Sequence, residues 1–134
     1  MKKVLLIVAF LSSALVAQEG LQVLQADRMK NMQEMETALA TIQKGFLFNN
    51  IHVVKNGVKD LKATTKLIES FIKVGVTKKG FNTLVYAQKQ AKDITELADR
   101  ITTTFEDGDR YGAANNYLQI LSKCLSCHQT VRAW

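Results

Sequence analysis

The chain has 134 residues, of which 47% are hydrophobic and 22% are charged, and it contains two cysteines and no proline. This length predicts a single domain. The formal charge of +6 is spread along the chain without an arginine-rich arm, so we expect acidic protein partners and no nucleic acid.

Residues 1–17 have the composition of a secretory signal peptide: a basic start with Lys2 and Lys3, an apolar stretch, and then small residues. The apolar stretch is too short to count as a membrane span. We expect cleavage after Ala14 or Ala17, export to the periplasm, and no stable membrane insertion afterwards. Loss of Lys2 and Lys3 lowers the formal charge from +6 to +4.

Residues 18–134 are predicted to form one helical domain, because apolar residues recur every three or four positions and strand-type alternation is missing. No proline is present to break a helix. The short connections make neighbouring helices antiparallel, so the predicted fold is all-α, an antiparallel up-down-up-down four-helix bundle. The predicted helices cover residues 21–44, 51–73, 80–105 and 109–132.

The first two helices carry apolar stripes and signals for their ends. Gly45 stands where the first helix could end, and Asn49 or Asn50 could cap the second. The spacing of the second stripe is typical of a bundle seam. The stripes consist of Met32, Met35, Leu39, Ile42 and Phe46 in the first helix, and of Ile51, Val54, Val58, Leu61, Thr65, Ile68 and Ile72 in the second.

The third helix follows a predicted loop at residues 74–79 and ends before a turn at residues 106–108. Asp109 is then a good N-cap for the last helix. We expect the inward face of the third helix to contain Phe81, Leu84, Gln88, Ala91, Ile94, Ala98, Ile101 and Phe105.

The last helix carries the most specific motif of the chain, Cys124-Leu125-Ser126-Cys127-His128, which uses both cysteines. This spacing is that of a c-type haem attachment site, in which two thiols form thioether bonds and the imidazole binds iron. On a helix the three side chains share one flank. A disulfide or a thioredoxin-like redox pair is the alternative, but the βαβ context of such a pair is missing.

The motif lies on the apolar stripe of its helix, so the face that must be buried is the face that would carry the haem. We therefore expect one haem c in the bundle interior, with Leu118 and Leu125 closing over its edge. The stripe consists of Ala114, Tyr117, Leu121, Cys124, His128 and Val131.

The layout resembles the cytochrome c′ family, especially its low-spin, methionine-ligated branch. The motif is C-terminal, with Lys123 before the first cysteine and Arg132 after the histidine, although Val131 stands where the family commonly has an aromatic residue. The first helix ends in Ile42-Gln-Lys-Gly45, similar to the family's Ile-x-Lys-Gly. The resemblance implies a bundle around the haem and a homodimer formed through the first two helices.

His128 is the expected proximal iron ligand, and the group on the distal face decides the function. The first helix has Met29, Met32 and Met35, which are either core filler or a source of a sulfur ligand. Counting back from Gly45, the resemblance implies Met29 as the distal ligand. Periodicity places Met32 and Met35 nearer the middle of the apolar stripe. We favour Met29, with Met32 as the alternative.

These residues predict a periplasmic monohaem c-type cytochrome that passes single electrons to periplasmic redox proteins and is not an enzyme. The first alternative is a high-spin protein of the cytochrome c′ type that binds nitric oxide or carbon monoxide at an open distal face. The second is a haem-free helical interaction protein whose cysteines are paired or bind a metal.

His52 and a row of lysines are two further candidates for a functional role. His52 is expected to lie on the surface, and bis-histidine ligation through it would need a different bundle end to meet the haem. The second helix carries a basic row that is either a solvated face or a docking patch for an acidic redox partner. The row consists of Lys55, Lys59, Lys62 and Lys66.

Overall fold

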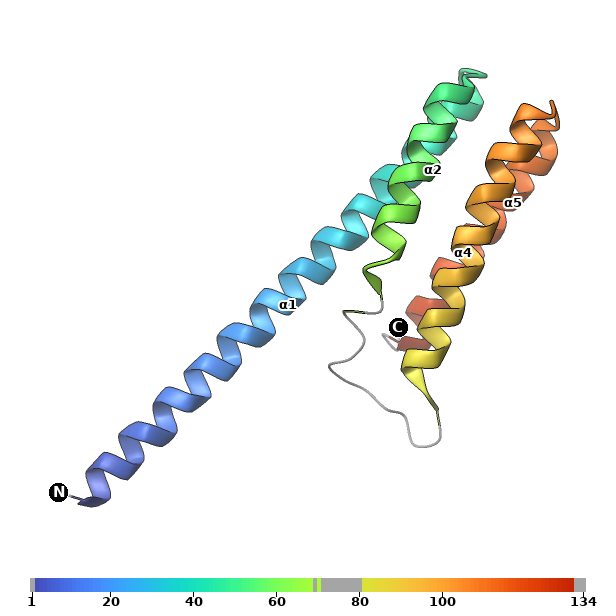
Figure 1. Ribbon diagram of the computed structural model, residues 1–134. Helices are drawn as coiled ribbons and strands as arrows, with labels where there is room; N and C mark the ends of the chain where they lie inside the picture. Colours follow the sequence, from blue (N-terminus) through green and yellow to red (C-terminus); the bar gives the residue numbers. More distant parts are fainter. Residues whose placement is uncertain (1, 69, 71–80, 132–134) are drawn as a thin grey trace.

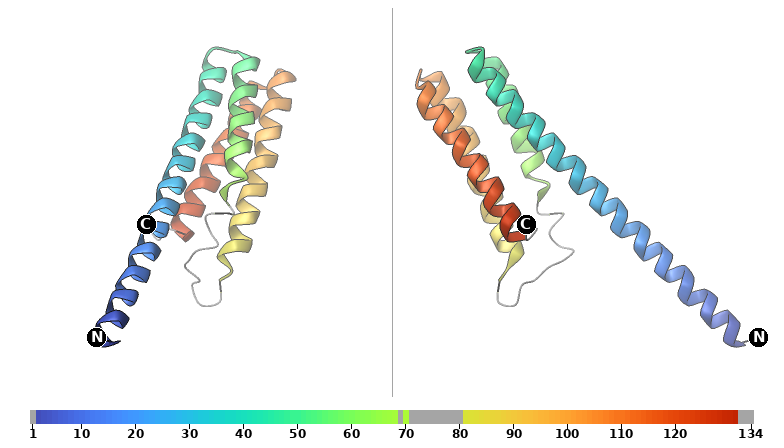
Figure 2. Two further views of the ribbon diagram at one scale, coloured as in Figure 1. Left: turned by 60° about the vertical axis from the view of Figure 1, so that its left-hand side comes forward. Right: turned by 180° about the vertical axis from the view of Figure 1, so that it is seen from behind.

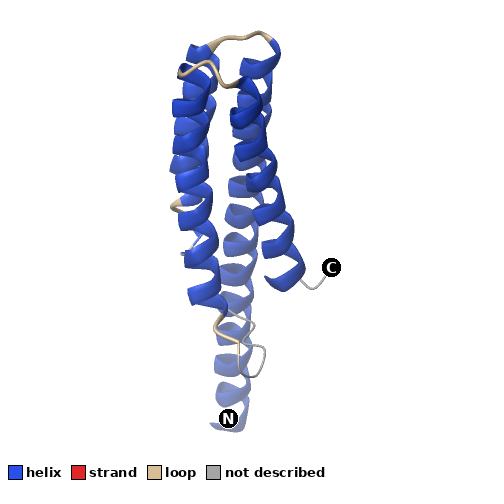
Figure 3. Ribbon diagram, turned by 90° about the vertical axis from the view of Figure 1, so that its right-hand side faces the viewer, coloured by secondary structure: helices blue, strands red, loops and turns tan. Residues whose placement is uncertain are grey.

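The computed structural model describes the backbone of residues 2–68, 70 and 81–131, and the side chains of residues 23, 25–68, 70 and 81–130. Four helices and no strand are found in this part of the chain, which confirms an all-α bundle of four helices (Figures 1 and 3). The helices are α1 (Lys2–Leu47), α2 (Ile51–Thr65), α4 (Thr83–Glu106) and α5 (Arg110–Val131).

The helices pack as two helical hairpins. Helix α1 packs along α2, α4 packs along α5, and α2 against α4 joins the two pairs. The turns at 48–50 and 107–109 lie at the same end of the bundle, here called the closed end (Figure 3). Away from this end α1 and α5 diverge, and the first half of α1 extends beyond the other helices (Figure 2).

The turn between α1 and α2 is built by two successive asparagines. Asn49 takes a left-handed backbone conformation (φ 47°), and the N–H groups of Asn49 and Asn50 donate to the carbonyls of Phe46 and Gly45 at 3.1 and 2.9 Å. This pattern is a Schellman motif. The side chain of Asn50 then accepts hydrogen bonds from the N–H groups of His52 and Val53, which confirms Asn50 as the N-cap.

The turn between α4 and α5 repeats the same construction. Gly108 has φ +87°, its N–H donates to Phe105, and the N–H of Asp109 donates to Thr104 at 2.9 Å. The side chain of Asp109 accepts a hydrogen bond from Gly112 N–H at 2.8 Å, which confirms the predicted N-cap. Arg110 ties the two turns together through a 2.7 Å hydrogen bond to Asn49.

Gly45 does not end α1, which continues to Leu47, so that prediction was wrong. A Cβ at Gly45 would come within 2.6 Å of a Val54 side-chain carbon, and one at Gly57 would come within 2.8 Å of Ile42 N. The two glycines therefore let the backbones of α1 and α2 approach closely. The predicted start at residue 21 also differs, because the helix is continuous from Lys2.

Helix α2 ends at Thr65, not at residue 73 as predicted. The hydroxyls of Thr64 and Thr65 both donate to the carbonyl of Leu61, at 3.0 and 2.6 Å. The chain then passes into a turn in which Leu67 N–H donates to the carbonyl of Thr64. The predicted loop at 74–79 lies outside the described residues.

Helix α4 begins at Thr83, behind Asn82, whose side chain accepts a hydrogen bond from Val85 N–H. Gln88 is exposed, so its predicted inward position was wrong; Ala87 and Gln90 are buried instead. The buried hydrophobic core otherwise follows the predicted stripes in much of its length. It consists of Met35, Ala38, Leu39, Ile42, Val54, Val58, Leu61, Ile68, Ala87, Ala91, Ile94, Leu97, Ala98, Ile101, Phe105, Ala113 and Ile120.

The buried side of α5 is shifted from the predicted stripe. Ala113, Asn116 and Ile120 are the buried residues there, whereas Tyr117 and Cys124 are only partly buried. The predicted signal segment continues α1 as helix, and its side chains lie outside the described residues. A search of the described helices finds none with the length and apolar character that a membrane crossing requires.

Candidate functional site

The motif Cys124–His128 lies within the last two turns of α5, with Cys124, Cys127 and His128 all half-buried. Two contacts hold this part of α5 against α4. Lys123 Nζ lies 2.6 Å from Asp93 Oδ2, and Thr130 Oγ1 lies 3.5 Å from the Tyr86 hydroxyl. Contacts with α4 therefore hold α5 directly before the motif and shortly after it.

Asp93 is shared between two lysines. Its Oδ2 accepts hydrogen bonds from Lys123 and also from Lys89, at 2.7 Å. These bonds lower the pKa of the Asp93 carboxyl, since they favour its charged form. Because Lys123 directly precedes Cys124, this triad sets the position of the first cysteine relative to α4.

The two thiols are free, and both cysteines are half-buried. Burial, together with a smaller effect of the neighbouring Cys127, raises the pKa of Cys124 to about 11, and burial also raises the pKa of Cys127. Cys124 packs against the hydrophobic core. Both thiols are therefore protonated at neutral pH, which makes them poor partners for disulfide exchange.

Tyr117 marks where α5 meets α1. Its ring packs edge-on against Phe46 of α1 at 5.8 Å. Burial raises the pKa of its phenol, and the charges of Cys124 and Glu36 raise it further. Cys124 is two turns beyond Tyr117 along α5, and Glu36 belongs to α1. Tyr117 therefore lies at the seam between α1 and α5, on the flank of α5 that carries Cys124.

The three methionines of α1 have different surroundings. Met29 is 54% exposed, Met32 is half-buried against the core, and Met35 is 6% exposed, with its sulfur 3.9 Å from the amide nitrogen of Asn31. Met29 is seven residues before Glu36, so both lie on the same flank of the helix. Met35 belongs to the core, whereas Met29 and Met32 lie nearer the seam.

Sequence reasoning missed two buried carboxamides. Asn31 and Gln90 are 2% and 6% exposed, and their oxygen atoms accept no hydrogen bond from the described residues. Gln90 lies one turn from Tyr86 and from Asp93 on the face of α4 that contacts the motif. A polar residue within an apolar helical repeat is the sequence signal that could have identified both.

The basic row of α2 is not a continuous patch. Lys55 pairs with Glu106, and Lys62 pairs with Asp99 at 2.5 Å, so two of the four lysines connect α2 to α4. Lys59 and Lys66 are exposed. The predicted surface position of His52 is confirmed.

The described part of the chain contains no group of three His, Cys, Asp or Glu side chains that could hold a metal ion. Comparison with protein-family models, with curated proteins and with solved structures gives no match. The functional assignment therefore depends on the residues of the candidate site.

Proposed function

We propose that the protein is a periplasmic monohaem c-type cytochrome that transfers single electrons, with its four helices in an antiparallel up-down-up-down bundle. The observation that carries this proposal is the motif itself. Cys124, Cys127 and His128 are spaced as for haem c, and all three are half-buried on α5. Neutral, unpaired thiols and an imidazole are the donor set that such a group requires.

Haem c, when bound, supplies the Fe(III)/Fe(II) couple. The thiols of Cys124 and Cys127 would hold it through thioether bonds, and the imidazole of His128 would bind its iron. The half-buried flank of α5 would restrict the access of water. The Asp93–Lys123 pair would keep this flank in a fixed position against α4.

The seam between α1 and α5 is where we place the macrocycle. Figure 2 shows that these helices diverge away from the closed end, and the contact of Phe46 with Tyr117 marks where they still meet. Cys124 follows Tyr117 by two turns, and Met29 precedes Glu36 by two turns. Because α1 and α5 are antiparallel in the proposed bundle, Cys124 and Met29 both lie two turns farther from the closed end than Tyr117 and Glu36. We therefore propose Met29 as the distal ligand, with Met32 as the alternative.

A second candidate function follows from the exposure of Met29. Met29 is 54% exposed, so little packing would hold its sulfur at an iron atom. An unoccupied sixth position would give a high-spin haem that binds nitric oxide or carbon monoxide. In that case the protein would capture or sense a gas and would not carry electrons.

A visible spectrum of the exported protein tests the proposal. We expect sharp low-spin bands on reduction and pigment that stays with the protein in acidified organic solvent. A broad high-spin spectrum would identify the gas-binding alternative. Colourless protein, or pigment that is extracted, would exclude covalent haem. Cys124→Ala combined with Cys127→Ala is the control, since it removes both thioether bonds.

The distal ligand is tested by replacing each methionine separately. Met29→Ala should convert the spectrum from low-spin to high-spin, whereas Met32→Ala should leave it low-spin. Met35→Leu is the matched control, because Met35 lies in the core and leucine has a similar side-chain volume. The reverse result for Met29 and Met32 would assign the ligand to Met32, and no effect from either would reject a methionine ligand.

A further inference from the structure

Two buried carboxamides each have an oxygen atom without a hydrogen bond. Asn31 of α1 is 2% exposed and Gln90 of α4 is 6% exposed. Within the described part of the chain, no group donates a hydrogen bond to Asn31 Oδ1 or to Gln90 Oε1. Burying a polar atom in this way destabilises a fold. Such an atom is therefore expected where another group supplies the missing hydrogen bond.

Gln90 lies opposite the second cysteine of the motif. It stands between Tyr86 and Asp93 on α4, four and three residues away, so all three share one flank of that helix. Tyr86 and Asp93 are the residues that contact α5. Their partners on α5 stand three and four residues from Cys127, on either side of it. Gln90 and Cys127 are therefore the middle residues of two helix flanks that lie against each other.

Asn31 reaches the same level of the bundle from α1. Ile42 of α1 lies against Gly57 of α2, and two ion pairs hold α2 in register with α4. Counting along the helices from these contacts places Asn31 within about one turn of Gln90. Asn31 is seven residues before Ala38, a core residue, and shares its flank of α1. Both carboxamides therefore lie inside the bundle beside the motif.

The surroundings of the two carboxamides favour an anionic group. Asp93 is shared by Lys89 and Lys123, so this triad of two lysines and one aspartate carries one net positive charge. Helix α2 ends at Thr65, before this level, and α1 and α5 diverge here (Figure 2). A carboxamide can turn its NH₂ group towards an anion, because rotation exchanges its oxygen and nitrogen atoms. Two such side chains beside a net positive charge suit a carboxylate.

We propose that Asn31 and Gln90 bind the propionate carboxylates of the haem through their carboxamide N–H groups. This inference rests on the proposed function, because it names further residues for the same prosthetic group. The propionates are the charged part of an otherwise apolar macrocycle, so they are the part that needs hydrogen bonds inside a bundle. Asn31 and Gln90 are positioning residues in this proposal, since neither anchors the haem covalently nor binds its iron.

The sign of a stability change separates this role from that of a carboxamide that is merely buried. Without a bound group, Asn31→Leu and Gln90→Leu remove an unsatisfied oxygen and would stabilise the fold. In the full chain with haem attached, we expect each change to raise the unfolding equilibrium constant by about fivefold or more, because a carboxylate loses its donor. Urea unfolding measures this constant.

Asn116→Leu is the matched control for both substitutions. Asn116 is a carboxamide of α5 that is 9% exposed, seven residues before Lys123 and thus two turns closer to the closed end. Its replacement should leave the unfolding constant equal or lower, because Asn116 lies away from the level of the motif.

Resonance Raman spectra of the same haem-bearing proteins give a direct readout. The bending mode of the propionate groups shifts when their hydrogen bonds are lost. We expect a shift in Asn31→Leu and in Gln90→Leu and none in Asn116→Leu, while the visible spectrum keeps its spin state. Haem-bearing protein with an unmoved band, or with more stable leucine variants, would overturn this inference alone. Colourless protein would overturn the proposed function with it.

Discussion

Asp93 is the charged residue whose environment most directly affects the candidate site. Because hydrogen bonds from Lys123 and Lys89 lower its pKa, the bonds stabilise the fold above the unfolded value of 3.8, and this contribution is lost as the pH falls through the lower, folded value. Asp93→Asn should therefore cost about 1 kcal/mol or less at neutral pH and flatten the acid limb of the stability profile. Urea unfolding at several pH values measures both effects.

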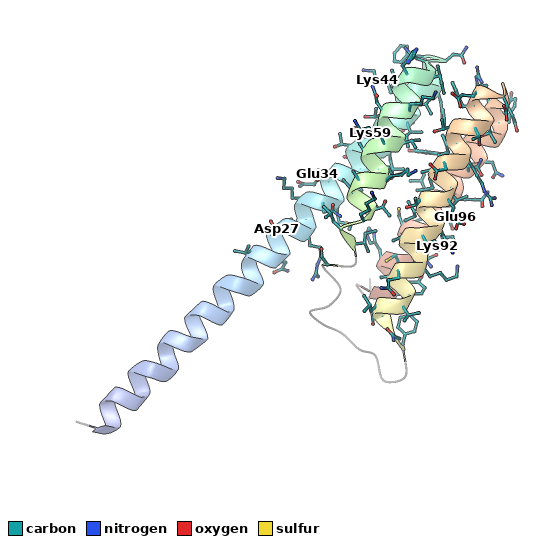
Figure 4. The ribbon with its side chains drawn as sticks, in the orientation of Figure 1. Asp27, Glu34, Lys44, Lys59, Lys92 and Glu96 are labelled. Carbon is teal, nitrogen blue, oxygen red and sulfur yellow. The ribbon has the colours of Figure 1, made fainter. Side chains whose placement is uncertain are left out.

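The control for Asp93 is Glu96→Gln on the same helix. Glu96 and Lys92 project outward from α4 as an exposed pair 3.8 Å apart (Figure 4). Such a pair contributes little, so this change should leave both the stability and its acid limb unaltered. Equal effects of the two substitutions would show that the bond to Lys123 has no special role.

The thiol of Cys124 gives a second prediction for single residues. In folded protein that carries no haem, a pKa of about 11 leaves about 100-fold less thiolate at pH 8 than the ordinary value of 9.0. Its reaction with a disulfide reagent should slow accordingly and accelerate in denaturant. A raised thiol pKa also means that stability is lost as the pH rises from 9 towards 11. Equal rates in native and denatured protein would contradict this burial.

The residues of the site differ in how far the sequence could identify them. Cys124, Cys127 and His128 form a local motif, so their spacing alone was sufficient to predict the candidate. Met29 and Met32 depend on how α1 lies against α5, which no local pattern specifies. Gln90 was missed because the inward face of α4 was predicted around Gln88, which is exposed.

At the level of elements, the hairpin of α1 and α2 depends on two glycines. Alanine normally favours a helix over glycine by about 1 kcal/mol, but a Cβ at Gly57 would clash with Ile42 N and the Ala38 carbonyl, at 2.8 and 2.9 Å. These backbone atoms cannot move aside without separating the helices. Gly57→Ala should therefore destabilise the protein by about 1–3 kcal/mol, measured by thermal or urea unfolding.

Asn56→Ala, at the adjacent exposed position, is the control for Gly57. It gains helix propensity and creates no clash, so the stability should stay equal or rise slightly. If Gly57→Ala were as harmless as Asn56→Ala, the close approach of the two backbones would be wrong.

The same hairpin shows why element boundaries were harder to predict than the elements. A glycine near the end of an apolar helical repeat has the local signature of a helix end, and Gly45 fits that signature. A glycine is required at position 45 because Val54 lies against it, and this contact exists only after α2 has folded back onto α1. The apolar repeat of α2 continues to Ile72, but α2 ends at Thr65. Periodicity cannot detect either effect.

In the whole molecule, the two hairpins are joined most firmly near the closed end. The ring of Phe46 stacks on Phe105 of α4 at 5.6 Å and meets Tyr117 of α5 at 5.8 Å, so one side chain of α1 contacts both helices of the other hairpin. Arg110 adds a hydrogen bond to Asn49 nearby. Beyond these contacts α1 and α5 diverge (Figure 2).

Phe46→Ala should therefore loosen the attachment of one hairpin to the other. Loss of the ring and its two aromatic contacts should cost about 3 kcal/mol. Hydrogen exchange should accelerate most in α1 and α5, while α2 and α4 remain packed against each other. Phe48→Ala is the control, because Phe48 is 70% exposed and its removal should change stability little. Uniform acceleration in all four helices would instead mean that the bundle opens as one cooperative unit and that the seam between α1 and α5 cannot part on its own.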